Sequence, residues 1–311
     1  MRLKKLIDLW NEFWFTPIEP TSIALFRIAY GVLILWAGAS YTPYLLLWFG
    51  RDGSLSLEVA KQIAPRGAIN LFLLLPPGDG WVIAFFAVFM AATFCLTIGL
   101  FTRASSIMVW LCLASFFYRQ QPIHNGADNI MRIVSFFLIF SPAGSALSVD
   151  RLLRIRRGKE SGDPPKSAPW VQRLLQIQLA VIYLTTFYWK ALGPVWADGL
   201  ALYYATRLED FWKFRIPYLF EHLWSIKLLT WCTLGIEFAL GTLIWISQLR
   251  YIVMLGGLFL HLGLEYTLDI PFFQWATLCL YITFIEPRHI RMVLDRIRGS
   301  LSRSTSRPAE G

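Results

Sequence analysis

The sequence predicts an all-α protein, a polytopic helical bundle that crosses a membrane about eight times. Three observations support this prediction. Hydrophobic residues make up 56% of the chain and charged residues only 16%, and the mean hydropathy is +0.51. Soluble domains usually carry about 25% charged residues. The apolar residues fall in long runs, and most of the 29 Lys and Arg residues lie in alternate segments between these runs. This composition excludes a soluble globule, a disordered chain and a nucleic-acid binder, despite the net charge of +9.

Eight apolar segments come close to the length of about 20 helical residues that a hydrocarbon core requires. In chain order they are Thr21–Phe49, Trp81–Phe101, Ala104–Tyr118, Ile133–Val149, Leu174–Trp189, Leu228–Gln248, Tyr251–Leu264 and Ile270–Ile285. The first, second and sixth segments reach this length, and the other five are shorter and must extend into polar flanks or pack among neighbours.

The basic residues predict the orientation of the bundle. They concentrate at the N-terminus, in the segment 151–173 and after residue 287, which the positive-inside rule assigns to the cytoplasmic side. An even number of spans with both termini in the cytoplasm satisfies this distribution. The sequence therefore predicts a multi-pass protein of the cell inner or plasma membrane, with the lipid bilayer as its first partner.

The predicted domain organisation is one membrane domain with polar ends. Residues 1–20 form an interfacial N-terminal segment, 21–287 the membrane domain and 288–311 a basic, disordered cytoplasmic tail. An inner linker, 151–167, divides two halves of four helices each. Short surface helices are expected at Leu55–Ile63 and, on the outer side, at Leu200–Trp212.

A cleaved signal peptide is an alternative interpretation of the N-terminus. The basic start and the small residues Ala37-Gly38-Ala39 resemble its n-region and cleavage site. However, acidic residues precede the apolar run, which continues past Ala39 to Phe49. We therefore expect an uncleaved first span, anchored by the aromatic residues around Trp10.

Ionisable residues inside membrane segments are costly and are functional-site candidates by default. His124, Asp128 and Arg132 follow each other at four-residue intervals and so share one helical face. An Asp128–Arg132 salt bridge is the structural interpretation, and it leaves His124 without a structural duty. Two interpretations of His124 are open: a functional role, or simply a polar residue at the membrane interface.

Lys190 ends the fifth segment, immediately before a Gly193-Pro194 break and Trp196. Snorkelling to the outer interface is one interpretation of this lysine. However, positive residues are disfavoured on the outer side, and a partly buried lysine loses its proton more readily, which suits a general base.

Two further pairs complete the set of polar residues. His261 and Glu265 are one helical turn apart in the outer half of the seventh segment, where the carboxylate could orient the imidazole or simply form a helix-end hydrogen bond. Glu237 lies near the middle of the sixth segment and needs a cation, and we expect Arg27 of the first segment to be its structural partner.

Several other types of site receive no support from the sequence. All four cysteines lie in apolar segments without a CxxC motif, and only four histidines are present. A haem between His124 and His261 lacks the usual neighbouring histidines. We expect no bound metal, and the motifs of soluble hydrolases and nucleotide-binding proteins are missing.

The order and spacing of several stretches resemble the HTTM (horizontally transferred transmembrane) domain family, to which the membrane part of vitamin K-dependent gamma-carboxylase belongs. The resemblance runs from Phe26 to Pro287. It rests on Phe26–Gly31, Ile123-His124-Asn125, Phe136–Phe140, Ser148-Val149-Asp150, Tyr188-Trp189-Lys190, Val195–Gly199, Tyr203-Tyr204, His261-Leu262 and Phe272–Glu286.

The resemblance implies an enzyme that uses reduced vitamin K or a related quinol. It gives Lys190 the role of the base that deprotonates the quinol, places His124 beside it, and makes Arg207 a contact for a glutamate substrate. The implied reaction couples quinol epoxidation by oxygen to carboxylation. The carboxylase has two adjacent lysines where this chain has Trp189-Lys190, and we expect this chain to lack the large lumenal region that binds protein substrates.

Two hypotheses follow. The first is a membrane enzyme with an outward-facing site for a quinone-like lipophilic molecule. Lys190 and His124 are its catalytic candidates, and the substrate-binding candidates are Arg207, Trp196, Asn125, His261 and Glu265. The polar residues with structural roles are Asp128, Arg132, Arg27 and Glu237. The second hypothesis is a non-catalytic transporter or accessory subunit. The sequence does not identify a membrane or periplasmic protein partner.

Overall fold

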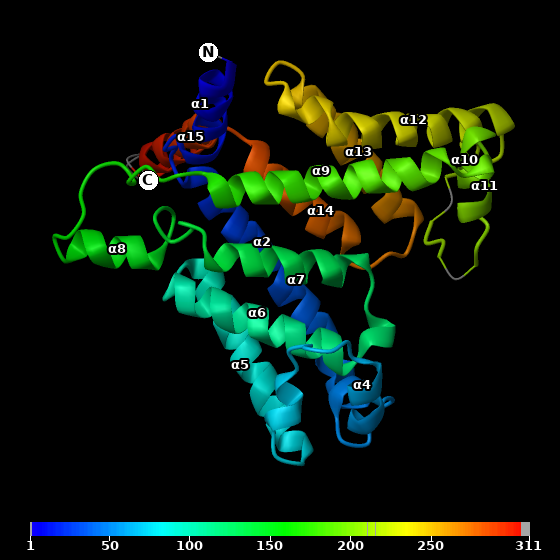
Figure 1. Cartoon of the computed structure of the whole chain (residues 1–311), viewed down its shortest axis with the longest axis horizontal. Coiled ribbons are helices and arrows are strands. Elements are labelled where there is room, and N and C mark those ends of the chain that lie inside the picture. Colours follow the sequence, from blue (N-terminus) through cyan, green and yellow to red (C-terminus); the bar gives the residue numbers. More distant parts are fainter. Residues whose placement is uncertain (1, 210, 215, 306–311) are drawn as a thin grey trace, which may run out of the picture.

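The computed structural model describes residues 2–209, 211–214 and 216–305. This part of the chain is helical, with two isolated β-bridges, Ile18 to Ser167 and Trp212 to Leu268. The chain passes repeatedly between two ends of the molecule, which lie towards the left and towards the right and bottom of Figure 1. The expected all-α class is confirmed.

The N-terminal half of the bundle contains four long helices that pack in chain order. They are α2 (Thr21–Tyr41), α5 (Asp79–Ile98), α6 (Thr102–Arg119) and α7 (Gly126–Ile139). Small residues allow the first two helices to approach closely, since a Cβ added at Gly31 would lie 2.3 Å from Thr97 Oγ1.

The C-terminal half repeats this arrangement with α9 (Trp170–Ala191), α12 (Leu223–Gly241), α13 (Arg250–Thr267) and α14 (Phe273–Tyr281). Helix α14 contacts α2, α7 and α9 as well as α13. It therefore joins the two halves, and buried residues of both form one apolar core.

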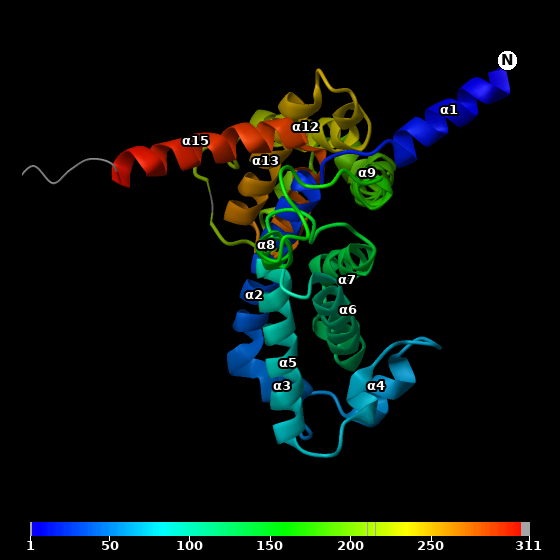
Figure 2. The same cartoon turned by 90° about the vertical axis from the view of Figure 1, so that its left-hand side faces the viewer.

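Short helices lie at the two ends. Helices α1 (Arg2–Phe15), α8 (Val149–Arg156) and α15 (Pro287–Thr305) lie at the left end of Figure 1, and α1 and α15 project in opposite directions in Figure 2. The opposite end holds α4 (Leu57–Ile63), α10 (Pro194–Ala197) and α11 (Ala201–Ala205). The remaining short helices are η1 (Thr42–Tyr44), α3 (Leu45–Phe49), η2 (Leu71–Leu74), η3 (Gln121–Ile123), η4 (Leu243–Trp245) and η5 (Ile282–Phe284).

Three helical segments are long and apolar enough to cross a membrane by themselves: Thr21–Phe49, Asp79–Ile98 and Leu223–Gly241. Each of the other five predicted segments also contains helix, but these helices are shorter or less apolar. The count of eight spans and the cytoplasmic position of both termini remain predictions.

Three expected boundaries are wrong. The fourth segment forms a helix over Gly126–Ile139 rather than Ile133–Val149, because Asn125 and Asp128 build a capping box at its start. The predicted disordered tail is helical as far as Thr305, and residues 306–311 lie outside the described part. The outer surface helix is restricted to Ala201–Ala205.

Candidate functional site

Lys190 lies in the last turn of α9, where its ammonium contacts the Glu237 carboxylate on α12. The Glu237 side chain is 8% exposed and that of Lys190 28%. The second carboxylate oxygen, Glu237 Oε2, is buried and has no hydrogen-bond partner among the described residues. Thr186 adjoins this carboxylate, but its hydroxyl donates to the Ile182 and Tyr183 carbonyls at 3.0 Å. The ion pair therefore leaves one buried acceptor open.

Trp196 covers the lysine from the other side. The Lys190 Nζ atom lies 4.7 Å from the centroid of its indole ring, within the range of a cation–π interaction. The chain reverses at Gly193 and starts α10 with Pro194 at its first turn, where the missing N–H costs no hydrogen bond. Trp231 of α12 donates to the Ala197 carbonyl at 3.2 Å and fixes α10 against the bundle.

The expected Arg27–Glu237 pair is wrong. Arg27 is fully buried and donates to the carbonyls of Ala143 at 2.8 Å and Leu147 at 2.6 Å, in the turn after α7. Its charge is thus met by backbone carbonyls at one end of the bundle, while Glu237 is paired with Lys190.

A second polar cluster lies within the C-terminal half, around the buried ring of His261. Nδ1 of this ring contacts Gln274 Oε1, and Nε2 is 2.5 Å from the Tyr183 hydroxyl, which is itself 2.6 Å from the hydroxyl of Tyr281. Gln274 Oε1 only accepts, so Nδ1 carries the proton of the neutral imidazole and Nε2 accepts from Tyr183. The donation then runs from Tyr281 through Tyr183 and His261 to Gln274.

Glu265 does not take part in this network. It pairs with Lys213 at 3.2 Å. The expected orientation of His261 by Glu265 is therefore wrong, and Gln274 performs that role.

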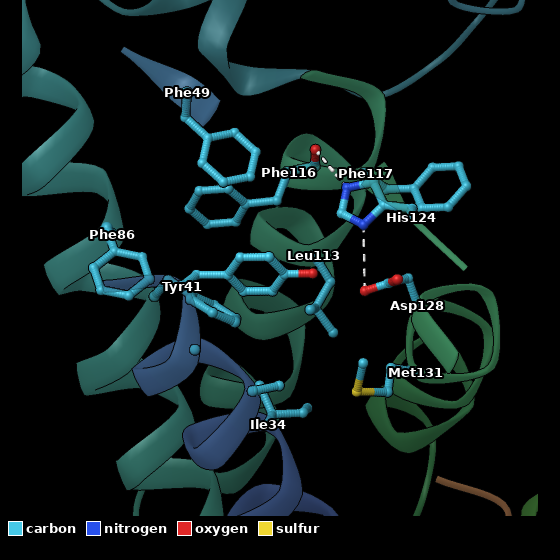
Figure 3. Close-up of a pocket in the computed structure, with 13 residues that line it drawn as sticks. Ile34, Tyr41, Phe49, Phe86, Leu113, Phe116, Phe117, His124, Asp128 and Met131 are labelled. Carbon is cyan, nitrogen blue, oxygen red and sulfur yellow. Dashed lines mark hydrogen bonds and ion pairs between the residues drawn. The ribbon is translucent and has the colours of Figure 1, made fainter. Parts of the chain in front are cut away.

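His124 lies in a third place, an apolar pocket between α2, α5, α6 and α7 (Figure 3). Its Nε2 is 3.1 Å from the Phe116 carbonyl, its Nδ1 is 3.3 Å from Asp128 Oδ1, and the ring stacks on Phe117 with centroids 5.0 Å apart. The cavity measures about 40 Å³ and is lined mainly by aromatic and aliphatic side chains. In Figure 3 the Tyr41 hydroxyl points towards its polar end.

Asp128 and Arg132 do not form the expected salt bridge. The other oxygen of Asp128 accepts from the Asn125 backbone N–H at 2.9 Å and completes the capping box. Arg132 donates to Tyr118 Oη and Asn129 Oδ1, both at 3.1 Å, and lies over the Phe117 ring. The side chain of Asn125 caps α7 and also donates to the Pro271 carbonyl at 3.3 Å.

Arg207 belongs to a fourth place, just after α11. Its guanidinium carbon lies 3.7 Å from the Tyr203 ring centroid, and its amino groups donate to the Tyr203 and Phe220 carbonyls at 3.0 and 3.5 Å. The structure therefore brings Lys190 together with Trp196 and Glu237. Within the described residues no hydrogen bond or ion pair connects them to His124 or Arg207.

Sequence reasoning missed Glu237 as the partner of Lys190, and it missed Tyr183, Gln274 and Tyr281 altogether. One signal was available for Tyr183. It precedes Lys190 by seven residues and so lies on the same face of α9.

Within the described residues, no group of three or more His, Cys, Asp or Glu side chains could hold a metal ion.

The fold and these buried polar clusters define a helical protein with candidate membrane spans and ionisable groups inside the bundle. The model of the HTTM domain matches residues 15–288, so the chain belongs to the HTTM family, a family of membrane domains related to gamma-carboxylase. No solved structure matches the chain.

Proposed function

We propose that this protein is a membrane enzyme that removes a proton from a lipid-soluble quinol at the Lys190–Glu237 pair. The observation that carries the proposal is the open carboxylate oxygen. Glu237 Oε2 is buried and has no hydrogen-bond partner in the described structure. The other oxygen, Oε1, contacts the ammonium of Lys190, which is partly exposed. A buried acceptor beside a fixed cation is the arrangement that a proton abstraction needs.

The pair divides the roles that the family resemblance gives to a single lysine. Because the Lys190 ammonium is paired with Glu237, we assign it the role of the fixed cation and not that of the base. Glu237 Oε2 accepts the proton, and Lys190 Nζ places its positive charge beside the hydroxyl oxygen that loses it. The net change at the pair is one proton gained by the carboxylate.

The residues around the pair suit a quinol, because the Trp196 indole offers an aromatic face and Tyr188 and Trp189 are exposed on the same turn of α9. Reduced vitamin K or a related quinol would supply the acidic hydroxyl and, with oxygen as oxidant, the electrons for epoxidation. The apolar surroundings keep bulk water from the open carboxylate.

The remaining candidates receive supporting roles. The Tyr281–Tyr183–His261–Gln274 network joins α9, α13 and α14 and stiffens the helix that carries Lys190. His124 with Asp128 offers a separate polar end to the aromatic pocket, which we assign to ligand binding rather than to the proton transfer.

The test is epoxide formation by purified protein in nanodiscs, supplied with reduced vitamin K and oxygen and followed by mass spectrometry. We expect the Lys190→Ala and Glu237→Gln variants each to lower the rate about 100-fold or more, the range that a positioned acid or base contributes. Lys61→Ala, on the outer helix α4, is the matched control and should retain the rate.

Epoxide formation that survives both substitutions would exclude the pair as the reacting site. If the natural protein binds the quinol but forms no epoxide, the second candidate function applies, a quinone-binding accessory protein without catalysis. The separation of His124 from Lys190 favours that candidate, because the two residues that the resemblance places side by side belong to different clusters.

A further inference from the structure

Two adjoining pockets on the outer half of the molecule share a wall. The first is a groove of about 220 Å³ between α12 and α13, lined almost entirely by apolar side chains and crossed by the segment 216–220. The second, of about 200 Å³, contains Thr206, Arg207 and Glu221. Ile216 and Phe220 line both pockets, so an apolar space and a charged space lie on either side of the same two side chains.

The segment that separates the two pockets is fixed to the bundle. Lys213 N–H donates to the Thr267 carbonyl at 2.9 Å, and Ser225 Oγ donates to the Leu219 carbonyl at 2.6 Å. The groove is therefore a built feature of the ends of α12 and α13, and its volume far exceeds the 10–15 Å³ that one water needs.

The charged pocket presents one cation and one anion. Arg207 is held in place by the Tyr203 ring and two backbone carbonyls, and Glu221 lines the same pocket. Within the described residues they form no ion pair with each other. Arg207 can thus meet a phosphate, and Glu221 an ammonium, of the same ligand.

We infer that the two pockets form one binding site for a phospholipid with an ethanolamine head. The hydrocarbon chain lies in the α12–α13 groove, the phosphate beside Arg207 and the ammonium beside Glu221. Van der Waals packing in the groove holds the hydrocarbon chain, and the paired charges select the head. This site is independent of the quinol chemistry proposed above.

Gly263 offers a direct test of the groove. A Cβ added there meets no atom within 4 Å, so the Gly263→Phe side chain starts from open space at the lining of the groove. Gly235 on α12 is exposed outside the groove and is equally open, which makes Gly235→Phe the matched control.

The experiment is native mass spectrometry of the purified, delipidated protein titrated with phosphatidylethanolamine, phosphatidylglycerol of the same chains, or oleate. We expect one tightly retained phosphatidylethanolamine. Gly263→Phe should weaken its binding about tenfold or more, and Gly235→Phe should leave it unchanged. Arg207→Gln should weaken both phospholipids, with rescue by Arg207→Lys.

Glu221→Gln isolates the head-group assignment, because it should remove the preference for ethanolamine over glycerol while phosphatidylglycerol binding is retained. Equal binding of the two phospholipids to the natural protein, tight binding of oleate, or full retention in Gly263→Phe would each overturn the inference. Alkylation of Cys232, an exposed thiol in the groove, gives a second readout that bound phosphatidylethanolamine should slow. Each variant is compared after gel filtration to confirm a monodisperse fold.

Discussion

The Lys190–Glu237 ion pair is a structural element as well as a candidate site, because it joins α9 to α12. Substituting Lys190 by Met leaves the buried Glu237 without its cation. Breaking a fully buried pair costs about 3–5 kcal/mol, and since Lys190 is 28% exposed we expect a smaller loss of about 1–3 kcal/mol. Thermal unfolding in detergent measures this loss. The double variant Lys190→Met/Glu237→Met should regain most of it, and an unchanged midpoint in the single variant contradicts the pairing.

Single residues show how far the sequence leads at this scale. Both Lys190 and Glu237 were identified from their unusual position in apolar segments. Their partnership was not, because the sequence gives the depth of a residue along its helix but not which neighbour that helix face meets. Arg27 was assigned to Glu237 for this reason, whereas the carbonyls that accept its hydrogen bonds come from the irregular turn 143–147.

At the scale of elements, Asp150, in the first turn of α8, caps the N-terminus of α6. Its carboxylate accepts from the N–H groups of Phe101 and Thr102, each at 2.8 Å, and from the Thr102 hydroxyl at 2.7 Å. Burial alone would raise the pKa of Asp150, but these hydrogen bonds together outweigh it and hold the pKa below its ordinary value of 3.8. A lowered pKa in the folded state means that the carboxylate stabilises the fold.

The sign of this effect gives a pH prediction. The stabilisation by Asp150 is complete above pH 3.8 and is lost as the pH falls through the lower pKa of the folded state. Asp150→Ala should therefore lower stability by about 1 kcal/mol at pH 7, as the loss of a helix cap does, and the difference should shrink towards pH 3. Unfolding followed by circular dichroism at both pH values measures it. A difference that is independent of pH excludes the charged carboxylate as its source.

Gly99 ends α5 with φ +72°, a left-handed conformation that favours glycine. A Cβ at this position would lie 2.4 Å from Arg27 Nη1 and 2.5 Å from Ser148 Cβ. Gly99→Ala should therefore destabilise the protein by about 1–3 kcal/mol, through backbone strain and displacement of the Arg27 guanidinium. Gly158, which has φ +67° and an open Cβ position, is the control, because Gly158→Ala carries the strain alone. Equal losses in the two variants contradict a packing role for Gly99.

On the scale of the whole molecule, the apolar segments located the helices but not their ends. Helix α7 starts at the Asn125–Asp128 capping box and ends at residue 139, before Pro142, although apolar residues continue beyond it. The C-terminal region, expected to be disordered from its basic composition, is helical to Thr305. Arg291 of α15 contacts Glu19 and lies 3.3 Å from Asp163, so distant acidic residues hold this helix against the bundle.

The alternation of the chain between two ends makes the orientation testable. Helix α4 lies at the end opposite to α1, α8 and α15, which matches the charge asymmetry behind the eight-span prediction (Figure 1). In a Cys232→Ser background, a membrane-impermeant maleimide added to intact cells should label Lys61→Cys. It should reach Lys4→Cys, Lys159→Cys and Arg288→Cys only after permeabilisation.

Labelling of Arg288→Cys but not Lys4→Cys in intact cells would indicate an odd number of spans. Labelling of all three and not of Lys61→Cys would reverse the bundle and move Lys190 to the cytoplasmic side, where a snorkelling lysine is common and its position no longer exceptional.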